Sequence, residues 1–407
     1  MPILSDYDQF QGLHWETGSL RNFLAYQGIT APHTSQPYSE ALLFGISGGI
    51  VMGYFTFAYQ GYDPMVRILT RNTFDPLETI YERLDIQSNV RQTANPDKGV
   101  GNLLDVLEAG SPAIVFADMF SLPYNVLSPD DGMWAMLPIL VYGYDQSHNI
   151  VWIADRSRKP LSVTTEELAF ARWRTKKNKF RLQTHQPPDP NKLRSAVEAG
   201  IRDCIQMFTE APPKGSKDNF GFLAYRKWAN LLRITNQRNS WEKEFPTGKK
   251  LYAALTSSFS DITIFGKDGG ADRKLFSQFL EEASLILDEP ELKGIADKFL
   301  ESSDAWDILA AALLPEDIPL LRETRELMIT KHQIFLEQGN STLDEIRQIT
   351  TRLAEIKVQV SADFPLSSSE TSELRETVAD RIMVIHDIEL DAIKELQAAT
   401  GLDPSNL

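Results

Sequence analysis

A short proline-rich segment separates two parts of the 407-residue chain that follow different sequence patterns. Within residues 186–190, three prolines follow the glutamine, and proline continues neither a helix nor a central strand. The part before this segment mixes helical periodicity with short apolar runs typical of strands, whereas the part after it consists mostly of amphipathic helical runs. We therefore expect an α+β N-terminal domain over 1–185, a linker over 186–192 and a helical accessory domain over 193–407.

The first part contains the elements of a small antiparallel sheet. Strands are expected over 113–117, 136–142, 150–154 and 180–183, the second and third of them as a hairpin. Thr164 and Glu167 have the spacing of a capping box, which predicts a helix beginning there.

The second part contains several helical runs. They are expected over 222–232, 249–258, 275–287, 292–299, 304–313, 318–337, 343–360 and 369–399. The pair over 318–337 and 343–360 predicts a helical hairpin, and Gly401 predicts the end of the last helix. Long amphipathic faces of this kind need a partner, so a homodimer is one expectation for this part.

Composition excludes several classes of protein. A hydrophobic content of 42% and a charged content of 24% exclude collagen-like, disordered and membrane classes. No apolar run approaches the roughly 20 residues of a membrane span, and no signal-peptide pattern opens the sequence, so we expect a cytoplasmic protein. The net charge of -15 disfavours binding to nucleic acid or to an anionic membrane.

The single cysteine limits thiol and metal chemistry. Cys204 shares one face of a helical pattern with Val197, Ile201 and Phe208, which predicts a buried structural thiol. One cysteine forms no intramolecular disulfide, and the six histidines show no paired metal-ligand spacing. We expect no bound metal and no cofactor, and the sequence has no dinucleotide-binding glycine pattern.

One dense basic cluster runs against the acidic composition. Residues 172–181 contain six Lys and Arg residues with Trp173 and Phe180 among them. Such a cluster indicates either a solvated turn followed by an edge strand, or a dock for an acidic partner or a phosphate.

The start of a predicted helix over 16–27 is the strongest candidate for a functional site. Leu20, Phe23 and Leu24 share its apolar face, and Gly28 follows as a stop. The N-terminus of a helix collects unpaired N–H groups and partial positive charge, which suits an oxyanion or a bound carboxylate. His14 and Trp15 precede this helix, and Glu16 opens it.

Other candidate side chains leave two interpretations open. The glycine-rich residues 45–49 favour a close turn, or a backbone cradle for phosphate or pantetheine at Ser47 and Gly48. Ser19 follows Trp15 by about one helical turn and is a further candidate hydroxyl. Arg71 suits a substrate carboxylate, although a pair with Asp75 is the simpler interpretation.

Several motifs together resemble the N-terminal domain family of butirosin biosynthesis protein H. They are GLHW at 12–15 with LRN at 20–22, YSEALLFGISGG at 38–49, MFSLPY at 119–124, and YGYD at 142–145 leading to Asp155. The resemblance extends more loosely past the proline-rich segment, through GGADR at 269–273 and FLEEA at 279–283.

The resemblance implies a papain-like N-terminal domain and transfer of an acyl group from a carrier-protein thioester to an amine. In such a family the helix is expected to open with His-Cys, so His14 matches and Trp15 replaces the nucleophile. A histidine is expected in the strand leading to residues 143–145, but residues 134–138 contain none. Asp155 matches the expected orienting acid. Two missing functional groups argue against an acyl-cysteine intermediate.

Three functions fit this altered site. The first is a biosynthetic acyltransferase-like enzyme acting directly, with His14 as base, the Glu16 helix start as oxyanion site and Asp155 as acid. Its substrate-binding residues would be Trp15, Ser19, Ser47, Gly48, Arg71 and Tyr124. The second is a catalytically silent relative that binds a carrier protein or pathway ligand, and the third is a cyclase or isomerase. An acyl carrier protein docked on residues 172–181 would present its phosphopantetheine as the substrate arm.

Overall fold

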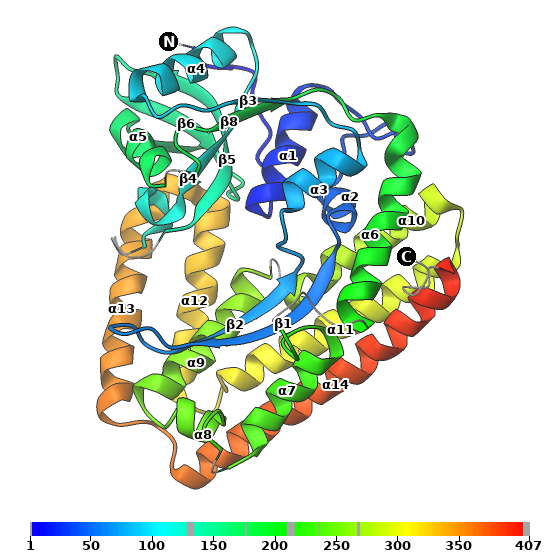
Figure 1. The fold of residues 1–407 in the computed structure, drawn as a ribbon. Helices are drawn as coiled ribbons and strands as arrows, with labels where there is room; N and C mark the ends of the chain where they lie inside the picture. Colours follow the sequence, from blue (N-terminus) through cyan, green and yellow to red (C-terminus); the bar gives the residue numbers. More distant parts are fainter. Residues whose placement is uncertain are drawn as a thin grey trace. The chain divides into compact units, whose positions relative to one another are not determined.

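The computed structural model describes residues 2–127, 134–175, 177–209, 216–235, 237–266 and 269–401. They form two compact units, each built from three segments of the chain (Figure 1). The first unit contains residues 1–43, 75–193 and 331–350, and the second contains residues 44–74, 194–330 and 351–407. The predicted linker over 186–192 divides the chain into domains that would fold independently. The two compact units do not test independent folding, so this division stays a prediction.

A six-stranded antiparallel sheet forms the centre of the first unit. In spatial order its strands are β3 (Ser88–Arg91), β8 (Leu182–His185), β4 (Ala113–Asp118), β5 (Met136–Asp145), β6 (Ile150–Ala154) and β7 (Leu161–Val163). Residues of β4 pair with β5 from Ala113 opposite Val141 to Asp118 opposite Met136. The predicted hairpin of β5 and β6 and the predicted strand β4 are confirmed.

The last predicted strand differs in position from the expectation. β8 begins at Leu182 and lies between β3 and β4, so it is an interior strand. The edge-strand interpretation of the basic segment is therefore wrong. The strand β3, which pairs with β8 on the side away from β4, has the polar sequence SNVR. This sequence lacks the alternating apolar pattern that predicts a strand.

Short helices surround this sheet. They are α1 (Trp15–Tyr26), α3 (Pro76–Arg83), α4 (Pro96–Glu108) and α5 (Thr165–Trp173), with 3-10 turns η1 (Met119–Ser121), η2 (Pro123–Asn125), η3 (Pro190–Lys192) and η6 (Gly339–Thr342). α1 packs on β5, burying Leu20, Phe23 and Leu24 as its sequence pattern predicts. The capping box of Thr164 and Glu167 begins α5, which confirms that prediction.

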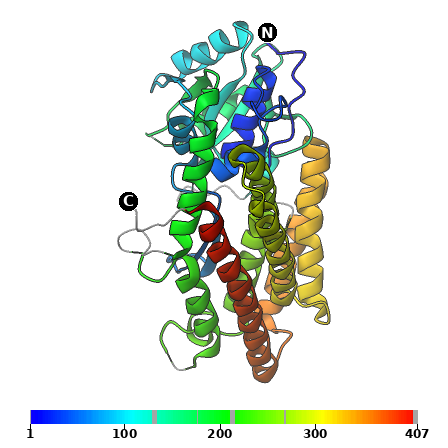
Figure 2. The same ribbon diagram turned by 90° about the vertical axis from the view of Figure 1, so that its right-hand side faces the viewer.

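The second unit combines a two-stranded sheet with long helices. β1 (Ile50–Phe57) pairs antiparallel with β2 (Met65–Arg71). The helices are α6 (Leu193–Thr209), α7 (Gly221–Arg233), α8 (Trp241–Glu244), α9 (Lys249–Phe259), α10 (Arg273–Leu287), α11 (Glu291–Leu313) and α14 (Ser368–Thr400), with a π-helical turn η4 (Ser260–Ile264) and a 3-10 turn η5 (Gly270–Asp272). α14 packs along α11 and α7 (Figure 2).

Most of the predicted helices are present, with one joining of neighbours. α11 is a single helix, whereas the sequence indicated separate runs over 292–299 and 304–313. The predicted helical hairpin is formed by α12 (Pro319–Gln338) and α13 (Leu343–Ala362), and α2 (Glu40–Ile46) is a further short helix. Gly401 ends α14 in the left-handed conformation. No helix of the described residues is long and apolar enough to cross a membrane.

A buried ion pair holds the helices of the second unit together. The Arg273 guanidinium donates to both carboxylate oxygens of Glu389, at 2.7 and 3.2 Å, and both side chains are fully buried. The Glu389 carboxylate also accepts hydrogen bonds from Tyr225, Ser302 and Trp306. Because these donors come from α7, α10 and α11 and Glu389 lies on α14, this one carboxylate joins four helices.

Candidate functional site

The N-terminus of α1 is occupied by a carboxylate of the chain itself. The backbone N–H groups of Leu13 and His14 donate to the two oxygens of Glu40, at 2.6 and 2.8 Å. The Thr17 hydroxyl donates to the same carboxylate at 2.8 Å. Glu40 is buried, so its charge is well placed to interact with the positive end of the helix. The capacity of these groups to bind an anion is thus used internally.

Trp15 lies where the resemblance places a cysteine, and the guanidinium of an arginine lies over its indole ring. The Arg156 guanidinium carbon lies 4.1 Å from the centre of the Trp15 ring and 5.3 Å from that of Phe335. Trp15 is 5% exposed. A desolvated cation over an aromatic face is stabilised by about 2 kcal/mol.

Asp155 positions this arginine from the end of β6. Its two oxygens accept hydrogen bonds from Arg156 Nε at 2.9 Å and Nη2 at 3.1 Å. The Tyr124 hydroxyl donates to Asp155 Oδ2 at 2.9 Å, and the Tyr124 ring stacks on Phe335. Burial and the Asp155 charge hold the pKa of Tyr124 well above its usual range, so the phenol stays a neutral donor.

We call Trp15, Tyr124, Asp155, Arg156 and Phe335 the Trp15–Arg156 cluster. In it the acid that would orient a catalytic histidine instead binds an arginine and a tyrosine. The cluster therefore contains neither a nucleophilic thiol nor an imidazole base.

The beginning of β5 lies beside α1. The Ser19 hydroxyl donates to the Pro138 carbonyl oxygen at 3.2 Å, so Ser19 is engaged with this strand. This is the strand in which the resemblance expects a histidine.

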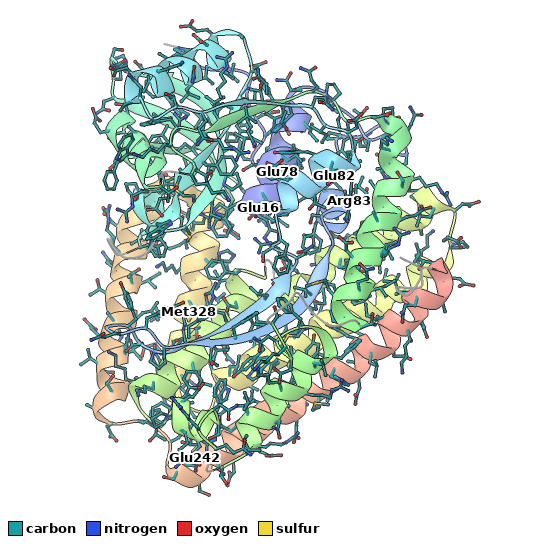
Figure 3. All side chains as sticks on the ribbon, in the orientation of Figure 1. Glu16, Glu78, Glu82, Arg83, Glu242 and Met328 are labelled. Carbon is teal, nitrogen blue, oxygen red and sulfur yellow. The ribbon has the colours of Figure 1, made fainter. Side chains whose placement is uncertain are left out.

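The predicted site residues separate into two groups. His14, Trp15, Glu16, Ser19, Tyr124 and Asp155 belong to the first unit, whereas Ser47, Gly48 and Arg71 belong to the second. Trp15, Tyr124 and Asp155 meet through Arg156. His14 is 2% exposed at the start of α1, and Glu16 lies in the first turn of that helix (Figure 3).

The residues placed in the second unit form a closed turn. The Ser47 hydroxyl donates to the Phe44 carbonyl at 2.7 Å, and the Asn72 amide donates to the Ser47 carbonyl at 3.0 Å. Gly48 has a φ of 112°, and a Cβ atom there would meet the Asn72 side chain. These contacts are those of a glycine turn. Arg71 is the last residue of β2.

Sequence reasoning missed Arg156 and Phe335. The one local signal for Arg156 is that it directly follows the matched acid Asp155. Phe335 comes from α12, far along the chain, and no pattern connects it with Trp15.

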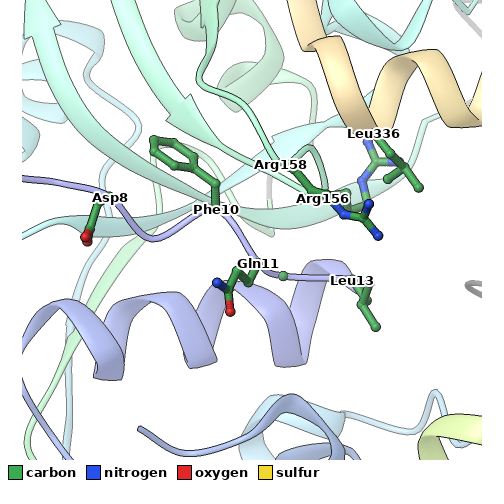
Figure 4. Close-up of a pocket in the computed structure, with 8 residues that line it drawn as sticks. Asp8, Phe10, Gln11, Leu13, Arg156, Arg158 and Leu336 are labelled. Carbon is green, nitrogen blue, oxygen red and sulfur yellow. The ribbon is translucent and has the colours of Figure 1, made fainter.

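A cavity of about 470 Å³ adjoins the cluster within the first unit (Figure 4). Its lining includes Arg156 and Arg158 on one side and Asp8, Gln11 and Leu13 on the other, together with Phe10, Gly12 and Leu336. The Arg158 side chain is exposed and forms no ion pair with any residue that the structure describes. A volume of this size is typical of small-molecule sites.

The arginines of the basic segment are engaged within the first unit. Arg172 is buried and donates to the Phe180 carbonyl, and burial lowers its pKa to about 10. Arg174 lies 3.4 Å from Asp118, and Arg181 lies 3.1 Å from Glu78. Lys177 is exposed, whereas Lys176 lies outside the described residues.

Two models of known protein families match parts of this chain. Residues 14–156 match the family model described as butirosin biosynthesis protein H, N-terminal. These residues are similar to that family. Residues 166–317 match a second model, the domain of unknown function DUF4872. No curated protein matches the chain. The butirosin-protein-H match contains the helix start, Trp15, Tyr124, Asp155 and Arg156, so the Trp15–Arg156 cluster lies mostly within the family's own region.

Proposed function

We propose that this protein acts in natural-product biosynthesis as an acyltransferase-like protein that binds an acyl substrate and does not transfer the acyl group. The family match supports the biosynthetic role. The observation that carries the rest is the Arg156 guanidinium stacked 4.1 Å from the centre of the Trp15 ring, at the position of the expected nucleophile.

The location of the only thiol supports the same conclusion. Covalent acyl transfer through cysteine requires an accessible thiolate. Cys204 is fully buried in α6, and burial raises the pKa of its thiol far above the usual range. It belongs to the second unit, whereas the cluster belongs to the first.

The order of elements supports a papain-like arrangement for the first unit. The helix that would carry the nucleophile, α1, packs on the strand expected to carry the base, β5. The acid follows the neighbouring strand β6 at Asp155. In this proposal the frame of a thiol enzyme is retained and its catalytic groups are replaced.

The cavity beside the cluster is the proposed place for the substrate arm. A carrier-bound phosphopantetheine would be a substrate here, with its phosphate near the exposed Arg158 and its acyl chain against Phe10, Leu13 and Leu336. The carrier would dock on the basic segment, where Lys177 remains exposed and Trp173 is 40% exposed.

Direct transfer with His14 as general base is the alternative. It is favoured by the position of His14 next to Trp15, at the start of α1. It is opposed by the 2% exposure of His14 and by the hydrogen bonds of the Leu13 and His14 amides to Glu40. Pure binding explains these contacts better.

Binding and turnover distinguish these functions. Acyl-pantetheine phosphate and an acyl-loaded carrier protein would be titrated into the full chain, followed by calorimetry and intact-protein mass spectrometry with an amine present. We expect saturable binding, no covalent adduct and no amide product. Arg158→Gln should weaken binding about fivefold or more, whereas the charge-matched Lys98→Gln should not.

Three other outcomes would decide against this proposal. Amide product that disappears in His14→Ala would establish direct transfer, and a stable acyl adduct on the protein would establish covalent catalysis. No saturable binding of either probe would remove the proposed substrate class.

A further inference from the structure

A second cavity, of about 520 Å³, lies wholly within the second unit and is unrelated to the site around Trp15. Its lining residues come from the end of β1, the residues after it, α8 and the beginning of α9. Its lining includes four aromatic residues, Phe57, Tyr59, Tyr62 and Phe245, and two lysines, Lys243 and Lys250.

The aromatic wall continues a row of parallel rings along β1. The Phe55 and Phe57 ring centres are 6.2 Å apart at 15° between planes, and those of Phe57 and Tyr59 are 6.0 Å apart at 9°. Alternate residues of a strand project on one face, which explains the row. Tyr59, at its outer end, is 61% exposed, so the row ends in a ring surface available to a ligand.

The opposite wall is held by packing with β1. The Trp241 indole donates to the Tyr54 hydroxyl at 2.9 Å, which attaches α8 to β1. Phe245 is 1% exposed and packs on Trp241. The two walls are therefore parts of one packed structure, as a preformed ligand site requires.

The charges at the rim favour an anion. The Lys243 and Lys250 side chains are exposed, and neither ammonium group forms an ion pair with the described residues. One carboxylate, Glu244, also lines the cavity, and it accepts a hydrogen bond from the Thr56 hydroxyl. The lining thus contains two ammonium groups and one carboxylate that already accepts a hydrogen bond. This excess of positive charge contrasts with the net charge of -15 of the whole protein.

We infer that this cavity binds a planar aromatic molecule that carries an anionic group, an aryl carboxylate being the simplest member of the class. The ring would stack on Tyr59 and Phe57, and the carboxylate would lie between Lys243 and Lys250. Stacking supplies orientation and apolar burial, while each exposed lysine adds a weak, salt-sensitive attraction.

Naphthoate is the probe for this inference, with two matched ligands. Naphthylmethanol keeps the ring without the charge, and cyclohexanecarboxylate keeps the charge without the aromatic ring. Binding to the full chain would be followed by calorimetry and by saturation-transfer NMR. We expect naphthoate to bind saturably and more tightly than either matched ligand.

Variants assign the binding to this cavity. Lys243→Gln with Lys250→Gln should weaken naphthoate binding about fivefold and leave naphthylmethanol unchanged. The charge-matched control pair, Lys293→Gln with Lys394→Gln on α11 and α14, should change neither. Tyr59→Ser should weaken both aromatic ligands. All of these residues are exposed, so circular dichroism should show intact folds.

Three results would overturn the inference. They are no saturable binding of naphthoate, equal binding of cyclohexanecarboxylate, or naphthoate binding that is unchanged by both the lysine pair and Tyr59→Ser. The last result would place the ligand elsewhere on the protein.

Discussion

Arg156 is the residue on which the contacts of the Trp15–Arg156 cluster converge. It bonds both oxygens of Asp155, lies over the Trp15 ring and donates to the Asn125 side chain at 2.6 Å. Its own backbone is in the left-handed region, with a φ of 45°, which is uncommon for a residue other than glycine. Arg156 thus connects the residues of the cluster and also lines the adjoining cavity.

Removing this arginine should destabilise the first unit. Arg156→Met keeps much of the side-chain volume but leaves the buried Asp155 carboxylate with only the Tyr124 hydroxyl as a side-chain donor. We expect the free energy of unfolding to fall by about 3 kcal/mol, as for other broken buried ion pairs. Urea unfolding measures this, with Lys98→Gln as the control. A stability equal to that of the unaltered chain would show that the pair contributes nothing net.

Asp261 is a buried acid whose ionisation should affect stability. It lies in the π-helical turn η4, and its Oδ2 accepts the Ile68 N–H at 2.8 Å. Burial raises its pKa to about 7, although Arg67 lies 2.9 Å from the other oxygen. The Arg67 side chain is 39% exposed, so solvent screens its charge and burial prevails.

The raised pKa of Asp261 predicts a direction for the pH dependence. The folded protein holds the proton more tightly than the unfolded chain, so this contribution is complete below about pH 4 and is lost as the pH rises towards 7. Asp261→Asn resembles the protonated acid. The stability of the unaltered chain relative to this variant should therefore decrease between pH 5 and 7, by at most about 1.4 kcal/mol per pH unit. Parallel urea-unfolding curves across this range would contradict the expectation.

At the scale of elements, α1 depends on a local sequence pattern for its formation and on a distant residue for the hydrogen bonds at its N-terminus. Its apolar residues and the glycine after its end are sufficient to predict the helix. The partner of its N-terminus is Glu40, which belongs to a separate helix and carries no local mark of that role. An anion at the start of α1 was expected from the unpaired N–H groups of a helix start, and Glu40 of the chain itself supplies it.

Replacing Glu40 tests how much that contact stabilises α1. Glu40→Ala removes the acceptor for the Leu13 and His14 amides and for the Thr17 hydroxyl. We expect the free energy of unfolding to fall by about 2 kcal/mol. Glu40→Gln keeps one carbonyl oxygen and should lose less. Thermal unfolding of both variants measures this, and equal losses would show that the charge rather than the acceptor geometry is what matters.

Local pattern also explains which elements were and were not anticipated. β4, β5, β6 and the long helices follow from periodicity, since each has a clear apolar repeat. β1 and β2 were missed, because they follow a glycine turn and flank a polar segment that reads as a loop. The join within α11 was missed because Ser302 and Ser303 interrupt its apolar pattern, yet both serines are buried.

At the scale of the whole molecule, Cys204 reports on cooperative opening. It is the only thiol of the chain and is fully buried. Burial raises the pKa of this thiol, so the native chain offers almost no thiolate. We expect a disulfide reagent to label the native protein at least about a thousandfold more slowly than the urea-unfolded chain. Rapid labelling without denaturant would contradict a buried Cys204, and Cys204→Ser is the control.

The two compact units are each assembled from segments that are separate in sequence. Such interleaving is decided by long-range packing, which a linear pattern of residues does not encode. The homodimer expected from the long helices stays a prediction. Light scattering on the full chain measures it, and a monomer would exclude it.

The sequence by itself determined the α+β character followed by helices, the resemblance of residues 14–156 to a known family and the absence of a thiol at the expected nucleophile position. These follow from periodicity, from motif order and from residue identity, which are all local properties. Only the tertiary structure decided that Arg156 covers Trp15, that Asp155 holds an arginine and that Glu40 occupies the start of α1. Apart from the adjacent Asp155 and Arg156, these contacts join residues far apart in the chain, so they exist only after the sheet and its helices have packed.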